Sequence, residues 1–424
     1  MSAGYIDSYY SRAQSDDRRW PVLRGEVDCD ICVIGGGLAG LNTALGLAQR
    51  GRRVVLLEGR RVAWGASGRN GGFVSPGYAL STEALAARVG MAQARRLYGL
   101  TVEAMALIRR RIAEQAIDCG PLQDGIVTAA WRGSASGMRA HVEFMNAEMG
   151  ATLRYWPEAE LRENYCSDRY GDACFAPDGL HLNALNFARG IAGMADRAGV
   201  AIHEGTTATA LRRQGDSFTI DCAEGRVRAE QIVLCMSGYA TDIQRRIRAA
   251  TLPVATYVML TEPAGEALAA SIRAPYAIAD SRRAGDYYRA LPDGRILWGG
   301  RVSTFRTPPA RLAETMLGDM RRVYPALRGI GAEVAWDGLM GYASHRMPQI
   351  GRLEEGIWYC MGFGGKGLCA TTMGGEVIAR AIAEGDESWR LFQAFPLGFA
   401  GGPLKPAIAQ LAYWWMQLRD TARI

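Results

Sequence analysis

Residues 31–40 of the chain read ICVIGGGLAG, an apolar strand followed at once by three glycines in G-x-G-x-x-G order. At these positions Gly35 makes a tight turn, Gly37 lets a pyrophosphate approach the backbone, and Gly40 lets a helix pack closely on the strand. The helix expected from Leu41 offers N–H groups and a positive potential at its N-terminus to the phosphates. The stretch predicts a nucleotide-binding turn.

A second apolar strand, Val54–Leu57, ends in an acidic residue, Glu58. Its carboxylate is placed to accept hydrogen bonds from ribose hydroxyls. The glycines alone are weak evidence, since a glycine-rich turn occurs in other α/β proteins. Strand, glycines, helix and acid at this spacing together predict a βαβ unit over 29–58 that binds a dinucleotide.

The composition of the 424 residues, with 49% hydrophobic and 22% charged residues, is typical of a globular chain with room for two domains. The net charge of +6 is spread out, and no run of five or more basic residues occurs. A nucleic-acid partner is therefore not expected. The basic residues are nearly all arginine, so the two lysines, Lys366 and Lys405, stand out.

The nine cysteines include one C-x-x-C pair, Cys29 and Cys32, for which a redox or zinc role has to be weighed. Along a strand these two side chains point to opposite faces, and no second Cys or His pair completes a site. His141, His181 and His203 show no ligand spacing either, so no metal is expected.

The cellular location is predicted from the cysteines and from the apolar segments of the sequence. The odd cysteine count and the lack of a secretory segment indicate a cytoplasmic protein. Residues 31–48 are largely apolar, but their Gly, Asn and Thr residues suit a strand, turn and helix better than a membrane span. No membrane span is expected.

Apolar periodicity predicts two helices within 81–116, broken near Gly90 or Gly99, and a helix over 138–149 that ends at Gly150. Further helices are predicted at 182–198, closed by Gly199, and at 309–323, which stops before Pro325. Strands are expected at 201–203, 207–212, 218–222, 227–229, 232–236 and 358–361, with a strand-rich stretch over 253–305. Residues 1–27 are expected to lie across the body of the protein.

Nucleotide-binding elements recur at 29–75, 150–240 and 340–385, with two insertions between them. We therefore predict a mixed α/β (α+β) fold in which a Rossmann-type domain is combined with a discontinuous substrate domain on an antiparallel or mixed sheet. The predicted nucleotide domain comprises 1–80, 150–240 and 335–424. The predicted substrate or cap domain comprises 81–149 and 241–334.

Several motifs together resemble the FAD-dependent amine and amino-acid oxidoreductases of the D-amino-acid oxidase superfamily, which includes sarcosine and glycine oxidases. They are the glycine fingerprint, GASGRNGG at 65–72, IVLCMSGY at 232–239, HRMPQIGR at 345–352, GFGGKGL at 362–368 and the tail GGPLKP…LAYWWMQLRD. The γ-glutamylputrescine oxidoreductase-like group is the most similar branch. The resemblance covers essentially the whole chain, and its cofactor motifs are more specific than its substrate motifs.

The resemblance implies a noncovalent FAD in an extended pose. The residues it implies as FAD contacts are Gly35, Gly36, Gly37, Leu38, Ala39, Gly40, Glu58, Gly59, Arg60 or Arg61, Gly65, Ala66, Ser67, Gly68, Asn70, Gly71, Thr207, Ala208, Ser237, Gly238, Gly362, Gly364, Gly365, Lys366, Gly367 and Leu368.

Two departures from the family pattern matter. Relatives that attach flavin covalently use a Cys before the P-x-I-G stretch or a His in the first loop, and DGLMGYAS and GASGRNGG contain neither. Sarcosine-type members hold the substrate carboxylate with a Lys near the position of Cys369, whereas the Lys here is Lys366. This departure puts an α-amino-acid substrate in doubt.

Three residues are predicted to take part in catalysis. Lys366 would stabilise negative charge on the reduced flavin and assist O2 reduction, or else pack beside the ribityl chain or face solvent. His345 would act as a base, or serve as a hydrogen-bonded structural residue of its loop. Tyr287 would form an aromatic wall above the flavin, or belong to a sheet face.

Further residues are candidates for the substrate pocket. Tyr287 and Arg289 are expected on one face of a strand, with Tyr288 on the other. Tyr288, Arg289 and Trp336 are predicted substrate contacts, although Trp336 could equally fill the core. The Tyr413–Trp414–Trp415 tail could bind a membrane or partner, but a helix docked on the protein itself is favoured.

The predicted activity is oxidation of the C–N bond of an amine, amino acid or amine conjugate to an imine that water hydrolyses, with O2 reduced to H2O2. One alternative is a dehydrogenase that passes electrons to a quinone or a protein. A second is oxidation of a 2-hydroxy acid, and a third is a flavin-bearing scaffold subunit without activity. The sequence leaves the oligomeric state open.

Overall fold

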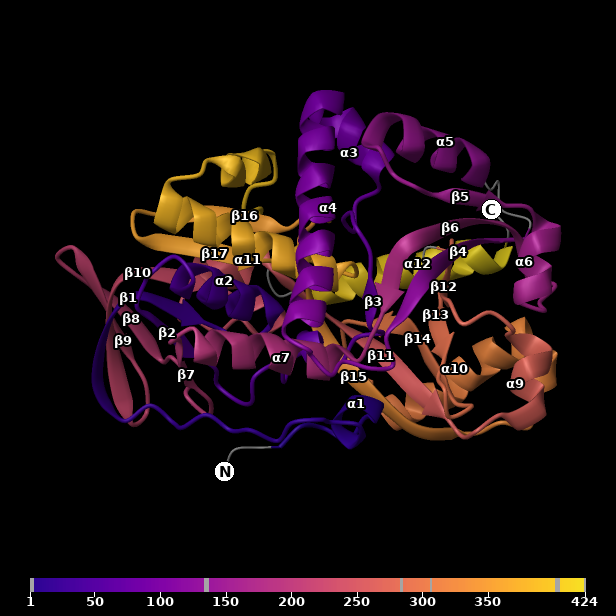
Figure 1. Cartoon of the computed structure of the whole chain (residues 1–424), viewed down its shortest axis with the longest axis horizontal. Helices are drawn as coiled ribbons and strands as arrows, with labels where there is room; N and C mark the ends of the chain where they lie inside the picture. The colour runs from indigo at the N-terminus through magenta and orange to yellow at the C-terminus, as the bar shows by residue number, and fades with distance from the viewer. Residues whose placement is uncertain (1–3, 133–136, 283–284, 306, 401–404, 423–424) are drawn as a thin grey trace.

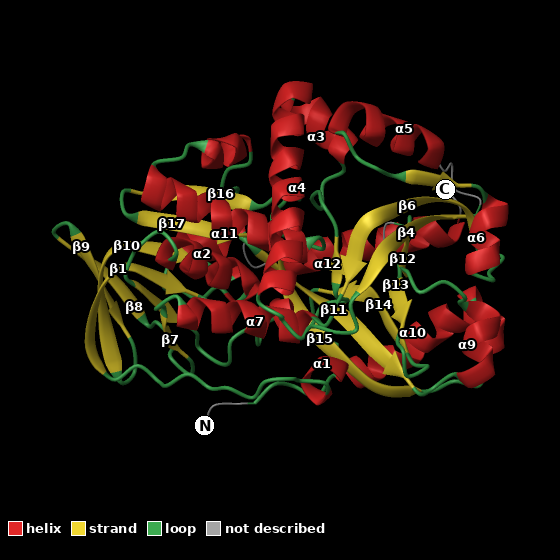
Figure 2. Cartoon of the chain, viewed as in Figure 1, coloured by secondary structure: helices red, strands yellow, loops and turns green. Residues whose placement is uncertain are grey.

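The computed structural model of the chain describes residues 4–132, 137–282, 285–305, 307–400 and 405–422. Two sheets dominate this part of the chain and lie side by side, one at the left and one at the right of Figure 1. Helices cover them on several sides (Figure 2). The fold is therefore mixed α/β, as predicted.

The first sheet contains the predicted nucleotide-binding unit and has eight strands within the described residues. They are β1 (Gly25–Ile34), β2 (Val54–Leu57), β7 (Ala201–His203), β8 (Ala210–Gln214), β9 (Ser217–Asp221), β10 (Gly225–Leu234), β16 (Gln349–Glu354) and β17 (Ile357–Met361). The order along the sheet is β16-β17-β10-β1-β2-β7, and the pairs from β17 to β7 are parallel.

Three helices pack beside this sheet: α2 (Leu38–Ala48), α7 (Ala184–Arg197) and α11 (Gly367–Glu384). They can approach closely because small residues lie at their contacts. A Cβ on Gly375 of α11 would come within 2.5 Å of the Asn42 side chain of α2. Strand β1 leads into α2 and α2 into β2, and this right-handed unit directs the carboxyl ends of the parallel strands to one edge.

The second sheet is mainly antiparallel, and the described part of the chain contributes nine strands to it. They are β3 (Phe73–Val74), β4 (Gln123–Trp131), β5 (Arg154–Trp156), β6 (Tyr170–His181), β11 (Leu252–Thr261), β12 (Ala277–Asp280), β13 (Tyr287–Ala290), β14 (Ile296–Ser303) and β15 (Ala332–Tyr342). The order is β15-β11-β14-β13-β12-β4-β6-β3, and only the β12–β4 pair in it is parallel among the described strands.

Helices cover the outer side of the second sheet and close its core. They are α6 (Glu158–Asn164), α9 (Gly265–Ser271) and α10 (Pro309–Val323). Met316, Met320 and Val323 share the buried face of α10 and pack in one cluster with Tyr257 and Trp298 of the sheet. These apolar residues recur at spacings of four and three, so they mark the face that α10 buries.

Two further helices, α3 (Thr82–Val89) and α4 (Met91–Glu114), lie between the two sheets in Figure 1. Gly90, with φ at +82°, separates them, so the predicted break lies there and not at Gly99. Helices α5 (Met138–Met149) and α10 have the predicted bounds, and α5 ends at Gly150 in a left-handed conformation.

The strand predictions were less complete. The two strands expected at 227–229 and 232–236 form one continuous strand, β10. Strands β5, β6 and β15 pair within the second sheet, whereas the predicted domain boundaries had grouped 150–181 and 335–342 with the nucleotide-binding part. Sheet membership depends on partners far away in the sequence, which local patterns do not reveal.

Residues 4–27 cross the body of the molecule, as predicted, and residues 1–3 of that prediction lie outside the described residues. The segment contains the short helix α1 (Tyr9–Arg12), and both Tyr10 and Trp20 are buried. The Tyr5 hydroxyl donates to the Val62 carbonyl at 2.8 Å. Among the described helices, none is both long enough and apolar enough to cross a membrane.

Candidate active site

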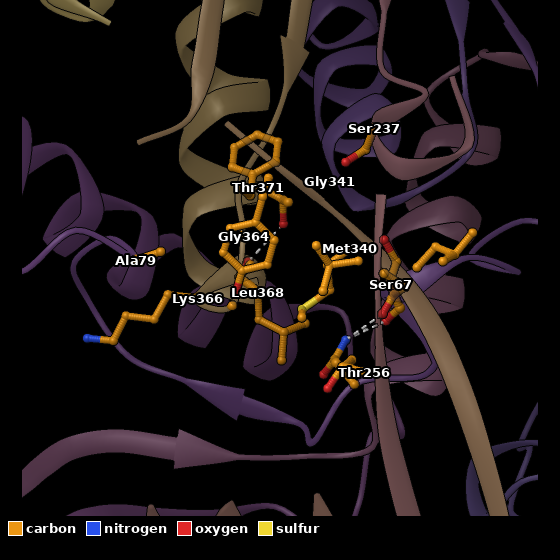
Figure 3. A pocket seen from close by; sticks show the side chains of 18 of the residues that line it. Ser67, Ala79, Ser237, Thr256, Met340, Gly341, Gly364, Lys366, Leu368 and Thr371 are labelled. Carbon is orange, nitrogen blue, oxygen red and sulfur yellow. Dashed lines mark hydrogen bonds between the residues drawn. The ribbon is translucent and has the colours of Figure 1, made fainter. Parts of the chain in front are cut away.

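A cleft of about 1650 Å³ lies where the two sheets meet and is lined by residues from both. Ligand pockets for drug-sized molecules hold about 300–1,000 Å³, so this cleft has room for a dinucleotide and a second small molecule together. Figure 3 shows part of it, with Ser67 and Ser237 on one side and Gly364, Leu368 and Thr371 on the other.

The glycine turn forms the first wall of the cleft, and close backbone approach explains why these residues are glycine. Gly35 has φ at +113°, and a Cβ there would lie 2.8 Å from the Cys235 carbonyl oxygen. A Cβ on Gly40 would lie 1.9 Å from the Gly35 carbonyl oxygen. Gly35 and Gly37 line the cleft, and Gly40 lies behind them where α2 meets β1.

The start of α2 faces the cleft through Leu38 and Ala39. The Leu38 N–H donates to Ser67 Oγ at 2.9 Å, which leaves the Ser67 hydroxyl proton available for an anion. Asn70 fixes the same loop, because its amide donates to the Ala66 and Ser67 carbonyls at 3.0 Å. The helix N-terminus and the Ser67 hydroxyl together suit a pyrophosphate.

Glu58 borders the cleft at the carboxyl end of β2. Its carboxylate accepts from the backbone N–H groups of Gly36 and Arg60, both at 2.8 Å. Removal from water raises its pKa, while these two N–H donors lower it. The carboxylate is thereby held where it can accept hydrogen bonds from a ribose diol.

The adjacent arginines differ in position. Arg60 lines the cleft, with its guanidinium 4.3 Å from the centre of the Trp64 ring. Arg61 is only 3% exposed and is outside the cleft lining. Its Nε donates to Glu204 at 3.0 Å. The structure therefore favours Arg60 as the nucleotide contact and gives Arg61 a structural role.

The closing glycine loop supplies the opposite wall through Gly364, Gly365, Lys366, Gly367 and Leu368. Gly364 has φ at +62°, and a Cβ there would lie 2.8 Å from the Tyr342 ring. The remaining predicted cofactor residues that line the cleft are Gly59, Gly65, Ala66, Gly71, Thr207, Ala208 and Ser237.

Five predicted cofactor glycines are not part of the lining: Gly36 and Gly40 of the glycine turn, and Gly68, Gly238 and Gly362. A Cβ on Gly68 would lie 2.5 Å from the Ala63 carbonyl oxygen, and one on Gly238 would lie 2.9 Å from that of Leu339. A Cβ on Gly362 would lie 2.9 Å from Gln349 Oε1. These positions require glycine for packing, and direct contact of their backbones with FAD stays a prediction.

These features fit FAD. The cleft offers a glycine turn at a helix N-terminus for the pyrophosphate, a carboxylate for the adenosine ribose, and a glycine loop on the far side for the ring system. Glu58, Ser67 and the Gly364–Leu368 segment would hold the cofactor. Within the described residues, no group of three or more His, Cys, Asp or Glu side chains is arranged to hold a metal ion.

Lys366 lies on the cleft wall, and its Nζ donates to the Pro76 carbonyl at 3.2 Å. In Figure 3 its side chain extends away from Ser67 and Ser237. The protein walls partly exclude water from the ammonium group, and this desolvation lowers its pKa. Lys366 is therefore a cation within the cleft that is held only by a neutral carbonyl among the described partners.

Tyr287 lines the cleft from β13. Its ring lies over two glycines, since Cβ atoms on Gly71 and Gly299 would come within 2.4 Å and 2.1 Å of it. Burial raises the pKa of the phenol well above its ordinary value, so Tyr287 is a neutral hydroxyl and not a base. Its position agrees with the prediction that it forms part of an aromatic wall.

The three predicted substrate residues are outside the cleft lining. Tyr288 is fully buried in the second sheet's own core, where its ring stacks on Trp298 at 4.0 Å between centroids. Trp336 is 1% exposed and its Nε1 donates to the Arg69 carbonyl at 2.9 Å. Both side chains are structural, and the prediction that they contact the substrate is wrong.

Arg289 is buried as well, although it follows Tyr287 by two positions. It donates to His181 Nδ1 at 2.8 Å and to the Leu182 carbonyl at 2.9 Å. Burial and the nearby guanidinium lower the His181 pKa to about 3, so this imidazole is neutral and can accept the hydrogen bond. Arg289 therefore connects β13 to the end of β6 and to α1 by hydrogen bonds, and it does not reach the cleft.

His345 is also outside the cleft lining. Its Nδ1 accepts from the Met347 N–H and its Nε2 contacts the Pro396 carbonyl, both at 3.2 Å. It ties its loop to the segment after η4 (Ser388–Ala394). These contacts favour the structural role for His345, and its action as a catalytic base stays a prediction.

His345→Ala should leave the dependence of kcat/KM on pH unchanged. A general base contributes about 10²- to 10⁴-fold to a rate, whereas we expect a change of less than about 2-fold here. Steady-state kinetics over pH 6–10 measure this, with thermal unfolding as a check on the loop. If the profile of kcat/KM against pH lost an ionisation in the variant, His345 would be a catalytic acid or base.

Tyr288→Phe should lower stability and spare catalysis. Its hydroxyl lies 2.9 Å from that of Tyr170 and 2.7 Å from that of Tyr324. Removing it leaves buried hydroxyls with a missing partner, at a cost of about 1–3 kcal/mol. Denaturant unfolding and kcat measure the two effects, with Tyr287→Phe as the matched control. A fall in kcat without loss of stability in Tyr288→Phe would contradict this placement.

Much of the cleft's second half was not predicted from the sequence. That half is lined by Tyr98 of α4, Ile126 and Thr128 of β4, Thr256 of β11, Arg301 of β14, Met340 of β15, and Gln410 and Tyr413 of α12 (Lys405–Ala422). Alternation along β4 and β11 carried some signal for the faces of these strands. Only the tertiary arrangement shows which face borders the cleft.

Comparisons with known proteins agree with this geometry. The protein family described as FAD dependent oxidoreductase (DAO) matches residues 30–381. The chain is 30% identical to gamma-glutamylputrescine oxidoreductase of Escherichia coli (strain K12) over 98% of both chains. It is 21% identical to glycine oxidase of Geobacillus kaustophilus, over 85% of this chain and 95% of that one.

Solved structures show the same fold. Glycine oxidase from Bacillus cereus ATCC 14579 superposes with a TM-score of 0.69 at 22% identity, covering 86% of this chain and 97% of that one. L-proline dehydrogenase from P. horikoshii gives a TM-score of 0.73 at 18% identity, covering 90% and 99%. With its glycine turn, Glu58 and closing loop, the chain belongs to the DAO family of FAD-dependent oxidoreductases, which act on amine or amino-acid donors.

Proposed function

We propose that the protein oxidises the C–N bond of an amine to an imine and that O2 takes up the two electrons and two protons to give H2O2. Water then hydrolyses the imine to a carbonyl compound and an amine or ammonia. The observation that carries this proposal is the character of the cleft half formed by the second sheet. It combines an apolar surface with hydroxyl groups and lacks a carboxylate among its described lining residues.

The wall of this half suits an aliphatic chain that ends in a neutral amine. Ile126, Met340 and Ala279 supply apolar surface, and Thr128, Thr256 and Tyr287 supply hydroxyl groups. Hydroxyls can donate to an amine lone pair or accept from its N–H groups. Bound FAD supplies the two-electron acceptor for the C–H bond next to nitrogen.

The charges of the cleft favour the neutral form of the amine. Lys366, Arg301 and Arg346 lie along the second half. The Arg301 charge is offset by Asp319, which accepts at 2.7 Å. The two carboxylates of the described lining, Glu58 and Glu224, belong to the first sheet's side. Exclusion of water and positive charge both lower the pKa of a bound ammonium, so the site can accept a neutral amine without a dedicated base.

An amine fits this site better than an α-amino acid. Relatives that hold a substrate carboxylate use a Lys where this chain has Cys369. The Cys369 side chain lines the cleft and donates to the Thr101 carbonyl at 3.1 Å, so it adds no positive charge there. The Escherichia coli relative is named for γ-glutamylputrescine, which makes mono-acylated diamines the first compounds to test.

Anaerobic mixing with candidate substrates tests the proposal. The panel contains γ-glutamylputrescine, putrescine, N-methylated amines, proline, glycine and 2-hydroxy acids, and the flavin absorbance is followed before and after oxygen is added. We expect an amine to bleach the flavin and oxygen to restore the colour within seconds, with formation of H2O2.

Other outcomes would contradict the proposal. Bleaching by 2-hydroxy acids alone would show that the enzyme oxidises a C–O bond and not a C–N bond. Slow return of colour in oxygen, with fast return on addition of a quinone, would indicate a dehydrogenase. A yellow protein that no compound bleaches would indicate a scaffold without this activity.

A further inference from the structure

The C-terminal helix α12 has two apolar faces, and only one of them is covered by the rest of the described chain. Its inner face packs on β14, where the Val302 N–H donates to the Tyr413 hydroxyl at 3.1 Å. The Thr304 N–H donates to Gln410 Oε1 at 2.9 Å. Gln410 and Tyr413 also line the cleft, so α12 forms part of its wall.

The outer face of α12 consists of five large apolar side chains that are 53–61% exposed. They are Ile408, Leu411, Trp414, Trp415 and Leu418. The aromatic tail was predicted to dock on the protein itself, which holds for Tyr413 but not for the two tryptophans. A continuous apolar face of this kind marks an interaction surface.

We propose that the outer face of α12 pairs with the same face of a second copy of the chain. Ile408, Leu411, Trp415 and Leu418 have the spacing 3-4-3, which is the a/d pattern of helices that pair with one another. A two-fold contact brings identical surfaces together, so a charged face would repel itself. Residues 406–418 carry no charged residue.

The size of the face agrees with a dimer contact. An aromatic side chain contributes about 150–250 Å² when it is fully buried, and two exposed tryptophans account for much of this face. If all five side chains of both copies became fully buried, pairing would bury at most about 1,200 Å², the lower bound for a specific stable interface.

A membrane surface is the competing occupant, and the placement of α12 disfavours it. A helix that lies in a lipid interface keeps a polar face rich in Lys and Arg toward the headgroups. The face of α12 opposite Trp415, with Gln410 and Tyr413, packs on β14 and borders the cleft. Pairing of two copies would instead cover the outer face of α12 and stabilise its position in the cleft wall. This inference does not depend on the proposed amine oxidation.

The oligomeric state of the FAD-loaded protein tests the proposal. Light scattering after size exclusion, over about 1–100 µM, should show a dimer. Leu411→Glu places like charges at the contact and should weaken dimerisation at least about 100-fold, because glutamate keeps helix propensity but repels its copy. Val102→Glu is the matched control, since Val102 is 45% exposed on α4, and it should leave the dimer intact.

Circular dichroism and FAD content report whether each variant is folded. Should Leu411→Glu fail to fold, Trp414→Gln provides the second test, with a smaller loss of dimer expected. A monomeric wild-type protein at 100 µM would overturn the proposal, as would a dimer that Leu411→Glu and Trp414→Gln leave unchanged. A monomer that sediments with phosphatidylglycerol vesicles would overturn it in favour of a membrane surface.

Discussion

Gly40→Ala should yield a protein that retains little or no FAD. The added Cβ would lie 1.9 Å from the Gly35 carbonyl oxygen, which is backbone and cannot move aside as a side chain could. The glycine turn and the start of α2 would have to separate. Overpacking costs typically 1–3 kcal/mol and occasionally more, so we expect FAD affinity to fall by about 100-fold.

Gly99→Ala is the matched control for this substitution. Gly99 lies within α4, and a Cβ there would meet nothing within 4 Å. An alanine in a helix interior should therefore be neutral or stabilise the protein by about 0.5–1 kcal/mol, with FAD content unchanged. Fluorescence titration with FAD measures both variants. An unchanged affinity of Gly40→Ala for FAD would show that the glycine turn does not bind the cofactor.

Lys366→Met should keep the FAD and slow the return of colour in oxygen. Removing one preorganised donor near a developing negative charge costs about 10²–10³-fold in rate. Because Lys366 is partly solvated and donates to Pro76, we expect a smaller loss, about 10–100-fold. Stopped-flow mixing of the reduced protein with oxygenated buffer measures it, and Lys366→Arg should retain most of the rate.

The dependence on pH gives Lys366 a second test. Desolvation lowers its pKa, so the charge present at neutral pH is lost as pH rises, below the ordinary value of about 10.4. Reoxidation of the wild-type protein should therefore slow as pH rises through this lowered pKa. The rate in Lys366→Met should show no such step. Equal oxygen kinetics in wild type and Lys366→Met would remove Lys366 from the mechanism.

The features that local sequence predicted are those set by local physics. The glycine turn follows from backbone distances between neighbours, and α5 and α10 follow from apolar periodicity and their end residues. Glu58 could be placed because a strand of known length carries it to the edge of the sheet. For these features, the residues that decide the structure lie close together in the chain.

The residues that were misplaced are those whose partners are distant in sequence. Arg289 was expected to share the cleft face with Tyr287, but its partners are His181 and Leu182 on another strand's end. His345 is tied to Pro396, and Arg61 to Glu204. The sequence alone does not distinguish a charged or aromatic side chain that contacts a ligand from one that contacts a buried protein partner.

The position of the C-terminal helix α12 also depends on partners that are distant in the sequence. Apolar residues repeat on both sides of α12, so periodicity alone does not determine which side docks. The hydrogen bonds to β14 show that the side with Gln410 and Tyr413 packs on the protein. The exposed tryptophans follow from that packing, and they became visible only in the structure.

The flavin content of the purified protein tests the central claim most directly. After denaturation, the flavin released into solution is identified and its amount compared with that of the chain. The cleft geometry predicts about one FAD per chain, released without a covalent bond. A colourless protein that takes up no added FAD would contradict the account of the cleft.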